Sequence, residues 1–220
     1  ANVSHDLRTP LTMIQAYAEM MRDIPGENTP ENVQVIIDEA GHLTGMVNDL
    51  LDISKLQAGV TQLNKAHFNL TKNLQAAVQR IGRMASANEF TIELICDHDE
   101  EVFVDADEFK IYQVVYNLIN NALNYSGDSR HVIVRQECIG DTVKVSVQDF
   151  GPGIAKENLP LVWERYYKVD KEHRRSFNGS GLGLAIVRKI LELHNAQYGV
   201  DSTLGRGSTF WFCLKVSDEN

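Results

Sequence analysis

The chain has 220 residues, of which 43% are hydrophobic and 23% are charged. This composition is typical of a soluble globular protein and excludes a disordered or collagen-like one, and the length suits one large domain or two small ones. Lys and Arg number 21 against 30 Asp and Glu, so the net charge is −9. An acidic chain is poorly suited to nonspecific nucleic-acid binding, and we expect no nucleic-acid partner.

The cysteines and the hydropathy restrict the class of protein further. Cys96, Cys138 and Cys213 lie far apart without a CxxC pair, which favours buried thiols in a reducing compartment over a zinc site or disulfides. No stretch approaches the roughly 20 apolar residues of a membrane span, and no signal-peptide pattern opens the chain. The chain starts with a helical pattern but neither a cap nor Met, which predicts a fragment of a longer protein.

Two helical patterns come first. In residues 3–21 the apolar positions are spaced 4, 4, 3, 4 and 3, which is one face of a helix. A breaker-rich turn follows, and Thr29 with Pro30 suits the N-cap and first position of a second helix with an apolar stripe over 33–51. Two helices with one narrow stripe each cannot bury themselves well alone. We therefore predict that this hairpin dimerises into a four-helix bundle.

The pattern changes after Gly59, so we expect two domains, 1–62 and 63–220. In the second domain the expected strands are 67–70, 91–96, 102–104, 131–138, 142–149, 198–203 and 208–215. The expected helices are 71–86, a long helix that begins at Asp105, and one near 184–195. Helices beside mostly antiparallel strands predict an α/β sandwich, and the fold class of the chain is therefore α+β.

The segment Ser4–Leu11 carries the first chemical signal. In a helix, His5 lies outside the apolar stripe, and Thr9 lies one turn further on the same face. Asp6 can hold the proton on one imidazole nitrogen and leave the other free as a nucleophile. A lone exposed histidine is usually an ordinary surface residue. However, Pro10 should kink the helix beside this one, which favours a functional interpretation.

A cluster of asparagines carries the second signal. Asn117 and Asn121 lie four residues apart, so both side chains project from one face of the expected helix. Paired amide oxygens can hold Mg²⁺ while phosphates supply the negative charge. Asn is a mediocre helix former, and three within 117–121 indicate a reason beyond helix formation, although a polar helix end remains the alternative.

Two glycine-rich segments carry the third signal. In 149–153 a buried Asp149 could accept a hydrogen bond from an exocyclic amine. The letters DFG also occur in protein kinases, but no HRD loop or VAIK strand accompanies them here. The segment 179–184 precedes a helix, where backbone N–H groups favour phosphate. It is not a dinucleotide-binding finger, because Leu184 replaces the required glycine. The basic stretch 168–178 suits either an ordinary solvated loop or a mobile lid over phosphates.

In their order and spacing these segments resemble the catalytic core of a bacterial two-component sensor histidine kinase, over about residues 1–215. The matching segments are SHDLRTPL (H-box), NLINNALNYS (N-box), DFGPGI (G1 box), WERYYKVD (F-box), GSGLGLAI (G2 box) and GRGSTF (a final Gly box). The resemblance implies a HisKA-type dimerisation and histidine phosphotransfer hairpin at 1–62. It also implies a catalytic ATP-binding domain of the Bergerat (GHKL) type, an α/β sandwich, at 63–220.

The resemblance also implies roles for single residues. His5 would be the phosphoacceptor, Asp6 its base, and Thr9 the residue that orients water during dephosphorylation of the partner. The implied ATP-binding residues are Asn117 and Asn121, which also bind Mg²⁺, together with Tyr125, Asp149 (adenine amine), Gly151, Gly153, Lys168, Gly179, Gly181, Leu182 and Gly183. Asn124 departs from the pattern, because the family usually carries a phosphate-contacting Lys there.

The implied activity is autophosphorylation of His5 from Mg-ATP and transfer to an aspartate of a response regulator, with dephosphorylation of that regulator as a further activity. The implied partners are a second copy of the chain and a receiver domain. The expected location is the cytoplasmic portion of a membrane-anchored sensor, with membrane contact only through segments absent from this chain. Whether His5 is phosphorylated in cis or in trans stays open, as does the balance of kinase and phosphatase.

Two alternatives were weighed against this interpretation. A GHKL ATPase clamp is disfavoured because Asn117 stands where such clamps carry a water-activating Glu, and because clamps lack an H-box hairpin. A receiver-binding module without phosphotransfer is favoured by Asn124 alone.

Overall fold

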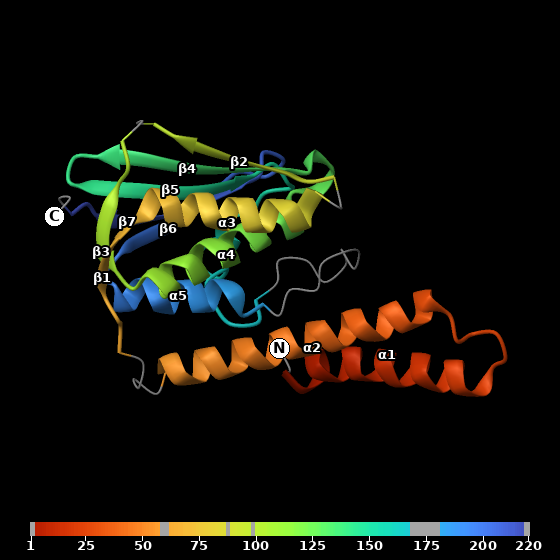
Figure 1. The fold of residues 1–220 in the computed structure, drawn as a ribbon. Helices are drawn as coiled ribbons and strands as arrows, with labels where there is room; N and C mark the ends of the chain where they lie inside the picture. Colours follow the sequence, from red (N-terminus) through yellow and green to blue (C-terminus); the bar gives the residue numbers. More distant parts are fainter. Residues whose placement is uncertain (1–2, 58–61, 87–88, 98–99, 168–180, 218–220) are drawn as a thin grey trace. The chain divides into compact units, whose positions relative to one another are not determined.

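A computed structural model of the chain describes residues 3–57, 62–86, 89–97, 100–167 and 181–217 (Figure 1). The chain separates into two compact units, Ala1–Lys55 and Leu56–Asn220. A helical hairpin comes first and a mixed α/β unit follows, as the sequence predicts.

The first unit is a helical hairpin of α1 (Val3–Asp23) and α2 (Pro30–Gln57). α1 continues through Pro10, which lies inside the helix. α2 begins at Pro30 as predicted, and the Thr29 hydroxyl accepts a hydrogen bond from the Asn32 N–H at 3.2 Å. The side chain of Thr29 therefore satisfies one of the backbone donors that a helix leaves unpaired at its start.

Large apolar side chains of the hairpin stay exposed in the single chain. Leu11 on α1 is 54% exposed, and Ile37 and Leu51 on α2 are 56% and 52% exposed. Exposed apolar residues of this size on neighbouring helices are typical of a surface that another protein surface covers.

The second unit is built on a five-stranded sheet with the strand order β2-β4-β5-β7-β6. Only β2 and β4 pair in parallel, whereas the other neighbouring strands are antiparallel. The strands are β2 (Thr91–Cys96), β4 (His131–Ile139), β5 (Thr142–Asp149), β6 (Gln197–Ser202) and β7 (Ser208–Lys215). A separate antiparallel pair joins β1 (Ala66–Asn69) to β3 (Phe103–Ala106).

Helices α3, α4 and α5 lie together on one face of the sheet (Figure 1). Their bounds are Leu70–Ala85, Glu108–Tyr125 and Gly183–Leu193. The core lies between these helices and the sheet, where apolar stripes of α3 and α4 meet alternating strand residues. Its fully buried members include Leu70, Leu74, Ile111, Leu118, Ile186, Val132, Val145 and Phe212.

The prediction that a helix begins at Asp105 is wrong. β3 continues through Ala106, because Asp105 and Ala106 pair with His67 and Ala66 of β1. The helix begins at Glu108, and Asp107 caps it by accepting the Lys110 N–H at 3.1 Å. Two aspartates could have served as the cap, and the pairing with β1, which lies far away in sequence, decides between them.

The cysteines are free thiols but are half-buried rather than buried as predicted. Cys213 shows the reason, because its position on β7 alternates with the buried Phe212 and Leu214 and therefore faces away from the helices. Burial still raises the pKa of each of the three thiols.

Candidate functional sites

The candidate phosphoacceptor lies on α1, where the His5 side chain is 74% exposed. Its Nδ1 atom lies 3.6 Å from Oδ1 of Asp6. This distance is slightly longer than a hydrogen bond, and a small side-chain rotation would close it. A carboxylate on this side favours the tautomer with a proton on Nδ1, which leaves the Nε2 lone pair directed to solvent.

Thr9 lies one turn beyond His5 on α1. Its hydroxyl donates a hydrogen bond to the His5 backbone carbonyl at 3.2 Å. The structure therefore brings His5, Asp6 and Thr9 onto the same short stretch of exposed helix, as the spacing predicts.

The candidate nucleotide site begins with the amides of α4. Asn117 and Asn121 are half-buried and occupy consecutive turns, and Tyr125 follows one turn later at the end of the helix. A Cβ atom added to Gly183 would lie 3.9 Å from Oδ1 of Asn117. The beginning of α5 therefore contacts the amide-bearing side of α4.

Asp149 ends β5 and is only 2% exposed. Its Oδ1 atom accepts hydrogen bonds from the backbone N–H of Gly151 at 2.9 Å and of Ser208 at 3.2 Å. Burial raises the pKa of the Asp149 carboxyl from 3.8 to about 6, although the two N–H donors oppose this rise by stabilising the anion. A carboxylate is therefore held at a fixed position inside the unit.

Glycines around Asp149 allow backbone segments to approach closely. A Cβ atom on Gly151 would lie 1.7 Å from the carbonyl oxygen of Tyr125. A Cβ atom on Gly207, where φ is +84°, would lie 2.1 Å from the Asp149 carbonyl oxygen. No side chain fits at either position, so glycine is required at both. We call the close-packed backbone of Gly151 and Gly207 around Asp149 the cradle.

Ser202 and Ser208 complete the cradle, and sequence reasoning did not single them out. The Ser202 hydroxyl accepts the Ile154 N–H at 2.8 Å and donates to the Gly207 carbonyl at 2.8 Å. Small polar residues are common at strand ends, so the sequence gives no specific signal for Ser202. The turn-like segment before β7 was the available signal for Ser208.

The described part of the G2 box lies at the start of α5. Gly181 has a φ of +69°, and its carbonyl accepts the Tyr166 N–H at 2.9 Å. Leu182 is 1% exposed and precedes the first helical residue. Lys168 and Gly179 lie outside the described residues, as does the predicted lid at 168–178.

The sequence-predicted residues thus form two groups. The first group on α1 contains His5, Asp6 and Thr9. The second group lies around α4, which carries both Asn117 and Tyr125. Tyr125 lies against Gly151, whose N–H donates to Asp149, and Asn117 lies beside Gly183. Among the described residues, no three His, Cys, Asp or Glu side chains are grouped so that they could hold a metal ion.

Comparisons with known families match both units. Residues 1–59 match the model of the His Kinase A (phospho-acceptor) domain. Residues 106–218 match the model of the histidine kinase-, DNA gyrase B- and HSP90-like ATPase.

Curated relatives match along the entire chain. The sensor histidine kinase WalK of Bacillus subtilis (strain 168) is 35% identical over 227 residues, which is 100% of this chain and 36% of WalK. The non-motile and phage-resistance protein of Caulobacter vibrioides is 33% identical over 225 residues, which is 98% of this chain and 26% of that protein. The chain therefore spans about a third or less of the length of these relatives.

A solved structure of full-length ShkA in complex with AMPPNP has a TM-score of 0.73 and 25% identity, and the match covers 98% of this chain and 45% of ShkA. Among the described helices, none is both long enough and apolar enough to span a membrane. One family match covers the hairpin and the other covers about half of the chain. The chain therefore belongs to the two-component sensor histidine kinases and forms their catalytic core.

Proposed function

We propose that this chain transfers the γ-phosphoryl group of ATP to His5 and then to an aspartate of a response regulator. The observation that carries the proposal is the buried carboxylate of Asp149, held by two backbone N–H groups within a glycine-lined cradle. A buried anion without a cation beside it is costly, and its retention is explained by a ligand that donates hydrogen bonds.

Adenine supplies such a donor. A carboxylate has about four lone-pair positions, and the two N–H groups do not use all of them. The exocyclic amine of adenine can therefore bind Asp149. ShkA was solved in complex with AMPPNP, a fact that supports an ATP-type ligand here.

Asn117 and Asn121 fit the polar end of Mg-ATP. Their amide oxygens are hard, neutral ligands, which suit Mg²⁺ when phosphate oxygens supply the charge. When bound, Mg²⁺ would neutralise part of the triphosphate charge. Neutral ligands also agree with the absence of a carboxylate cluster among the described residues. The basic lid position Lys168 is proposed as an additional phosphate contact, with Gly153, Gly179, Gly181 and Leu182 shaping the site.

His5 is the nucleophile of the transfer step. Its Nε2 lone pair attacks the γ-phosphorus, forming the N–P bond while the bond to the β–γ bridging oxygen breaks and ADP leaves. Asp6 beside Nδ1 stabilises the positive charge that develops on the ring. In the second transfer a carboxylate oxygen of the receiver aspartate attacks the phosphorus, and the O–P bond forms as the N–P bond to His5 breaks and the imidazole leaves.

Two further proposals concern the hairpin unit. Thr9 assists dephosphorylation of the receiver, because rotation about its χ1 angle would free the hydroxyl to hold a water molecule beside His5. The exposed Leu11, Ile37 and Leu51 are covered by a second copy of the chain, giving a homodimeric four-helix bundle. We propose the membrane-anchored, cytoplasmic setting for the parent protein.

The test is autophosphorylation with radiolabelled ATP and Mg²⁺, comparing the wild type with His5→Gln. We expect an acid-labile, alkali-stable label that is lost in His5→Gln and retained in His42→Gln, a matched change on α2. Label that persists in His5→Gln would identify another nucleophile. Nucleotide binding without any label would instead favour a receiver-binding module.

A further inference from the structure

A groove runs between α3 and α4, and its first half lies near the start of α4. This hollow has a volume of about 480 Å³. It is lined by Lys72, Asn73 and Arg80 of α3 and by Phe109 and Tyr112 of α4. Neither His5 nor the proposed nucleotide-binding residues line it.

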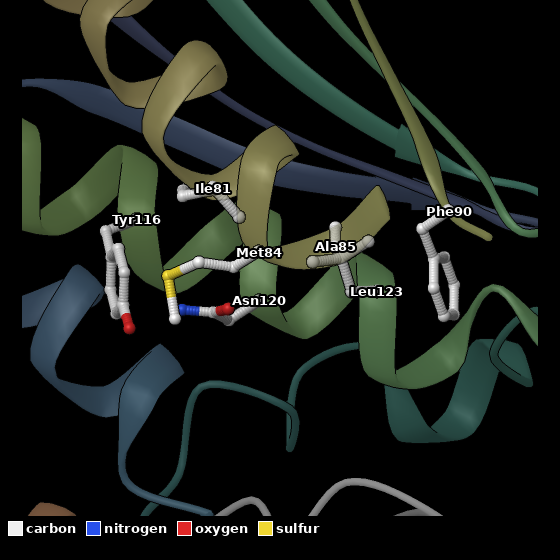
Figure 2. Close-up of a pocket in the computed structure, with 7 residues that line it drawn as sticks. All are labelled: Ile81, Met84, Ala85, Phe90, Tyr116, Asn120 and Leu123. Atoms are coloured by element: carbon white, nitrogen blue, oxygen red, sulfur yellow. The ribbon is translucent and has the colours of Figure 1, made fainter. Parts of the chain in front are cut away.

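The second half of the groove is shown in Figure 2 and has a volume of about 190 Å³. Met84 extends from α3 toward Tyr116 and Asn120 of α4, with Leu123 further along the same helix. Tyr112 lines the first hollow and Tyr116 the second, and the centroids of their stacked rings are 6.4 Å apart, so the two hollows are neighbours between the same two helices. We call the whole feature the α3–α4 groove. From Phe109 to Leu123 it extends about 21 Å at 1.5 Å per residue.

Two buried polar atoms in the first half have no hydrogen-bond partner among the described residues: Oδ1 of Asn73 and the hydroxyl of Tyr112. Asn73 is 8% exposed. Buried polar groups are nearly always paired, because leaving one unpaired is costly. Two such atoms in one hollow indicate an occupant that supplies their partners.

The groove also exposes large apolar side chains. Phe109 is 72% exposed and Met84 is 67% exposed, the two highest values for large hydrophobic residues in the described parts of the chain. Tyr116 between them is 38% exposed. Aromatic residues and Met are the types enriched at protein interfaces.

The charge of α3 opposes that of the whole chain. Its residues include Lys72, Arg80 and Arg83 but no Asp or Glu, whereas the net charge of the chain is −9. Lys72 pairs with Glu101 at 3.0 Å, but Arg80 and Arg83 form no ion pair with any described residue. Arg83 does not line the groove and donates to the Gln79 carbonyl, so the charge argument rests on Arg80. Although Glu108 also lines the groove, the Arg80 guanidinium, which has no ion pair with a described residue, favours an acidic partner.

We propose that the α3–α4 groove binds an acidic amphipathic helix of a partner protein. About four turns of helix fit its length, and apolar side chains at i, i+4 and i+7 would cover Phe109, Tyr116 and Met84. Asn73 Oδ1 and the Tyr112 hydroxyl are closed off from solvent, so binding would require both side chains to turn toward the groove. Carboxylates of the partner would then accept hydrogen bonds from Arg80 and the Tyr112 hydroxyl. A side-chain N–H or O–H of the partner would donate to Oδ1 of Asn73.

The test measures fluorescence polarisation of labelled helical peptides with the full chain. The panel carries Leu, Phe or Trp on one face and Glu elsewhere, and a matched panel replaces every Glu with Lys. We expect saturable binding of an acidic peptide and none of its basic counterpart. Binding of both panels alike, or no saturation by any acidic peptide up to about 1 mM, would overturn the proposal.

Surface variants locate the binding. Arg80→Glu and Phe109→Ser should each weaken the acidic peptide about tenfold, the loss expected for one interface anchor. Lys215→Glu likewise reverses a positive charge and Ile139→Ser likewise replaces an exposed apolar side chain, both at positions elsewhere, and both should leave the affinity unchanged. Equal losses in the controls would contradict binding at the groove.

Tyr112→Phe separates a binding role from a structural one. Removing an unpaired hydroxyl should leave the melting temperature unchanged or raise it, while the peptide binds several-fold more weakly. A lower melting temperature with unchanged affinity would mean that an ordered water satisfies the hydroxyl, and the proposal would then be wrong.

Discussion

Asp149 is the residue at which stability and the proposed function oppose each other. Its carboxyl is buried, and its pKa is raised to about 6 against 3.8 in the unfolded chain. The folded state therefore binds the proton more tightly, and this group lowers stability progressively as the pH rises from about 4 to above 6. The two-unit difference corresponds to about 3 kcal/mol at neutral pH.

Asp149→Asn should accordingly raise the melting temperature at pH 8 but not at pH 4. The same variant should lose nucleotide affinity at least about tenfold, because the amide N–H₂ would face the adenine amine. Thermal unfolding measures the melting temperature, and titration with a fluorescent ATP analogue measures the nucleotide affinity. Asp141→Asn, at an exposed position, is the control. Retained nucleotide binding would contradict the role of Asp149.

Gly151 tests the cradle. Gly151→Ala places a methyl group 1.7 Å from the Tyr125 carbonyl oxygen, so the two backbone segments must separate. We expect a destabilisation of about 1–3 kcal/mol and loss of nucleotide binding. Gly82→Ala is the matched control, because its Cβ meets nothing within 4 Å and lies inside α3, where it should stabilise by about 1 kcal/mol. Chemical denaturation measures both changes.

Thr9 tests the proposed dephosphorylation. Thr9→Ala should abolish dephosphorylation of the response regulator while autophosphorylation of His5 continues, because only the former needs the hydroxyl. The decay of labelled receiver protein in the presence of ADP measures the first, and the label on the kinase measures the second. Unchanged decay would exclude Thr9 from this role.

At the scale of elements, α4 shows how one helix serves three purposes. One face is buried against the sheet through residues such as Val115 and Leu118. A second side presents Asn117 beside α5, and a third lines the α3–α4 groove with Tyr112 and Tyr116. Rotating the helix by one residue, about 100°, would displace all three at once.

The hairpin supplies the prediction at this scale. Ile37→Glu or Leu51→Glu should convert a dimer into a monomer, because each buries a charge where the second copy is proposed to pack. Light scattering after size exclusion measures the mass, and Ile139→Glu in the second unit is the control. A wild type of monomeric mass would contradict the proposed dimer.

At the scale of the whole molecule, two compact units predict two unfolding transitions. The midpoint temperature of the hairpin's unfolding transition should rise with protein concentration, because dimerisation stabilises the folded hairpin. Mg-ATP should raise the midpoint temperature of the α/β unit, because at 100 times Kd it adds about 2.7 kcal/mol to the free energy of unfolding of that unit. Calorimetry distinguishes the two, and Asp149→Asn should weaken only the second response. A single transition that moves with both would contradict independent units.

Local patterns in the sequence predict most of the helices and strands and indicate the candidate site residues, because both depend on residues that are close together in the chain. Helical and alternating periodicity found the helices and strands to within a few residues, and Thr29 with Pro30 marked the start of α2. The motifs likewise predict His5 and Asp149 as site residues and indicate the family, which the comparisons confirm. The helix start predicted at Asp105 from local spacing is wrong, because pairing with β1 extends β3 through this residue.

The packing of the complete unit, and no local pattern, decides which distant residues meet. The parallel pairing of β2 with β4, the contact of Tyr125 with Gly151 and the bond from Ser208 to Asp149 join residues far apart in the chain. The α3–α4 groove, with its unpaired polar atoms, arises in the same way from two helices packed side by side. Periodicity records which face of an element is buried, but the partner of that face depends on the packing of the complete unit.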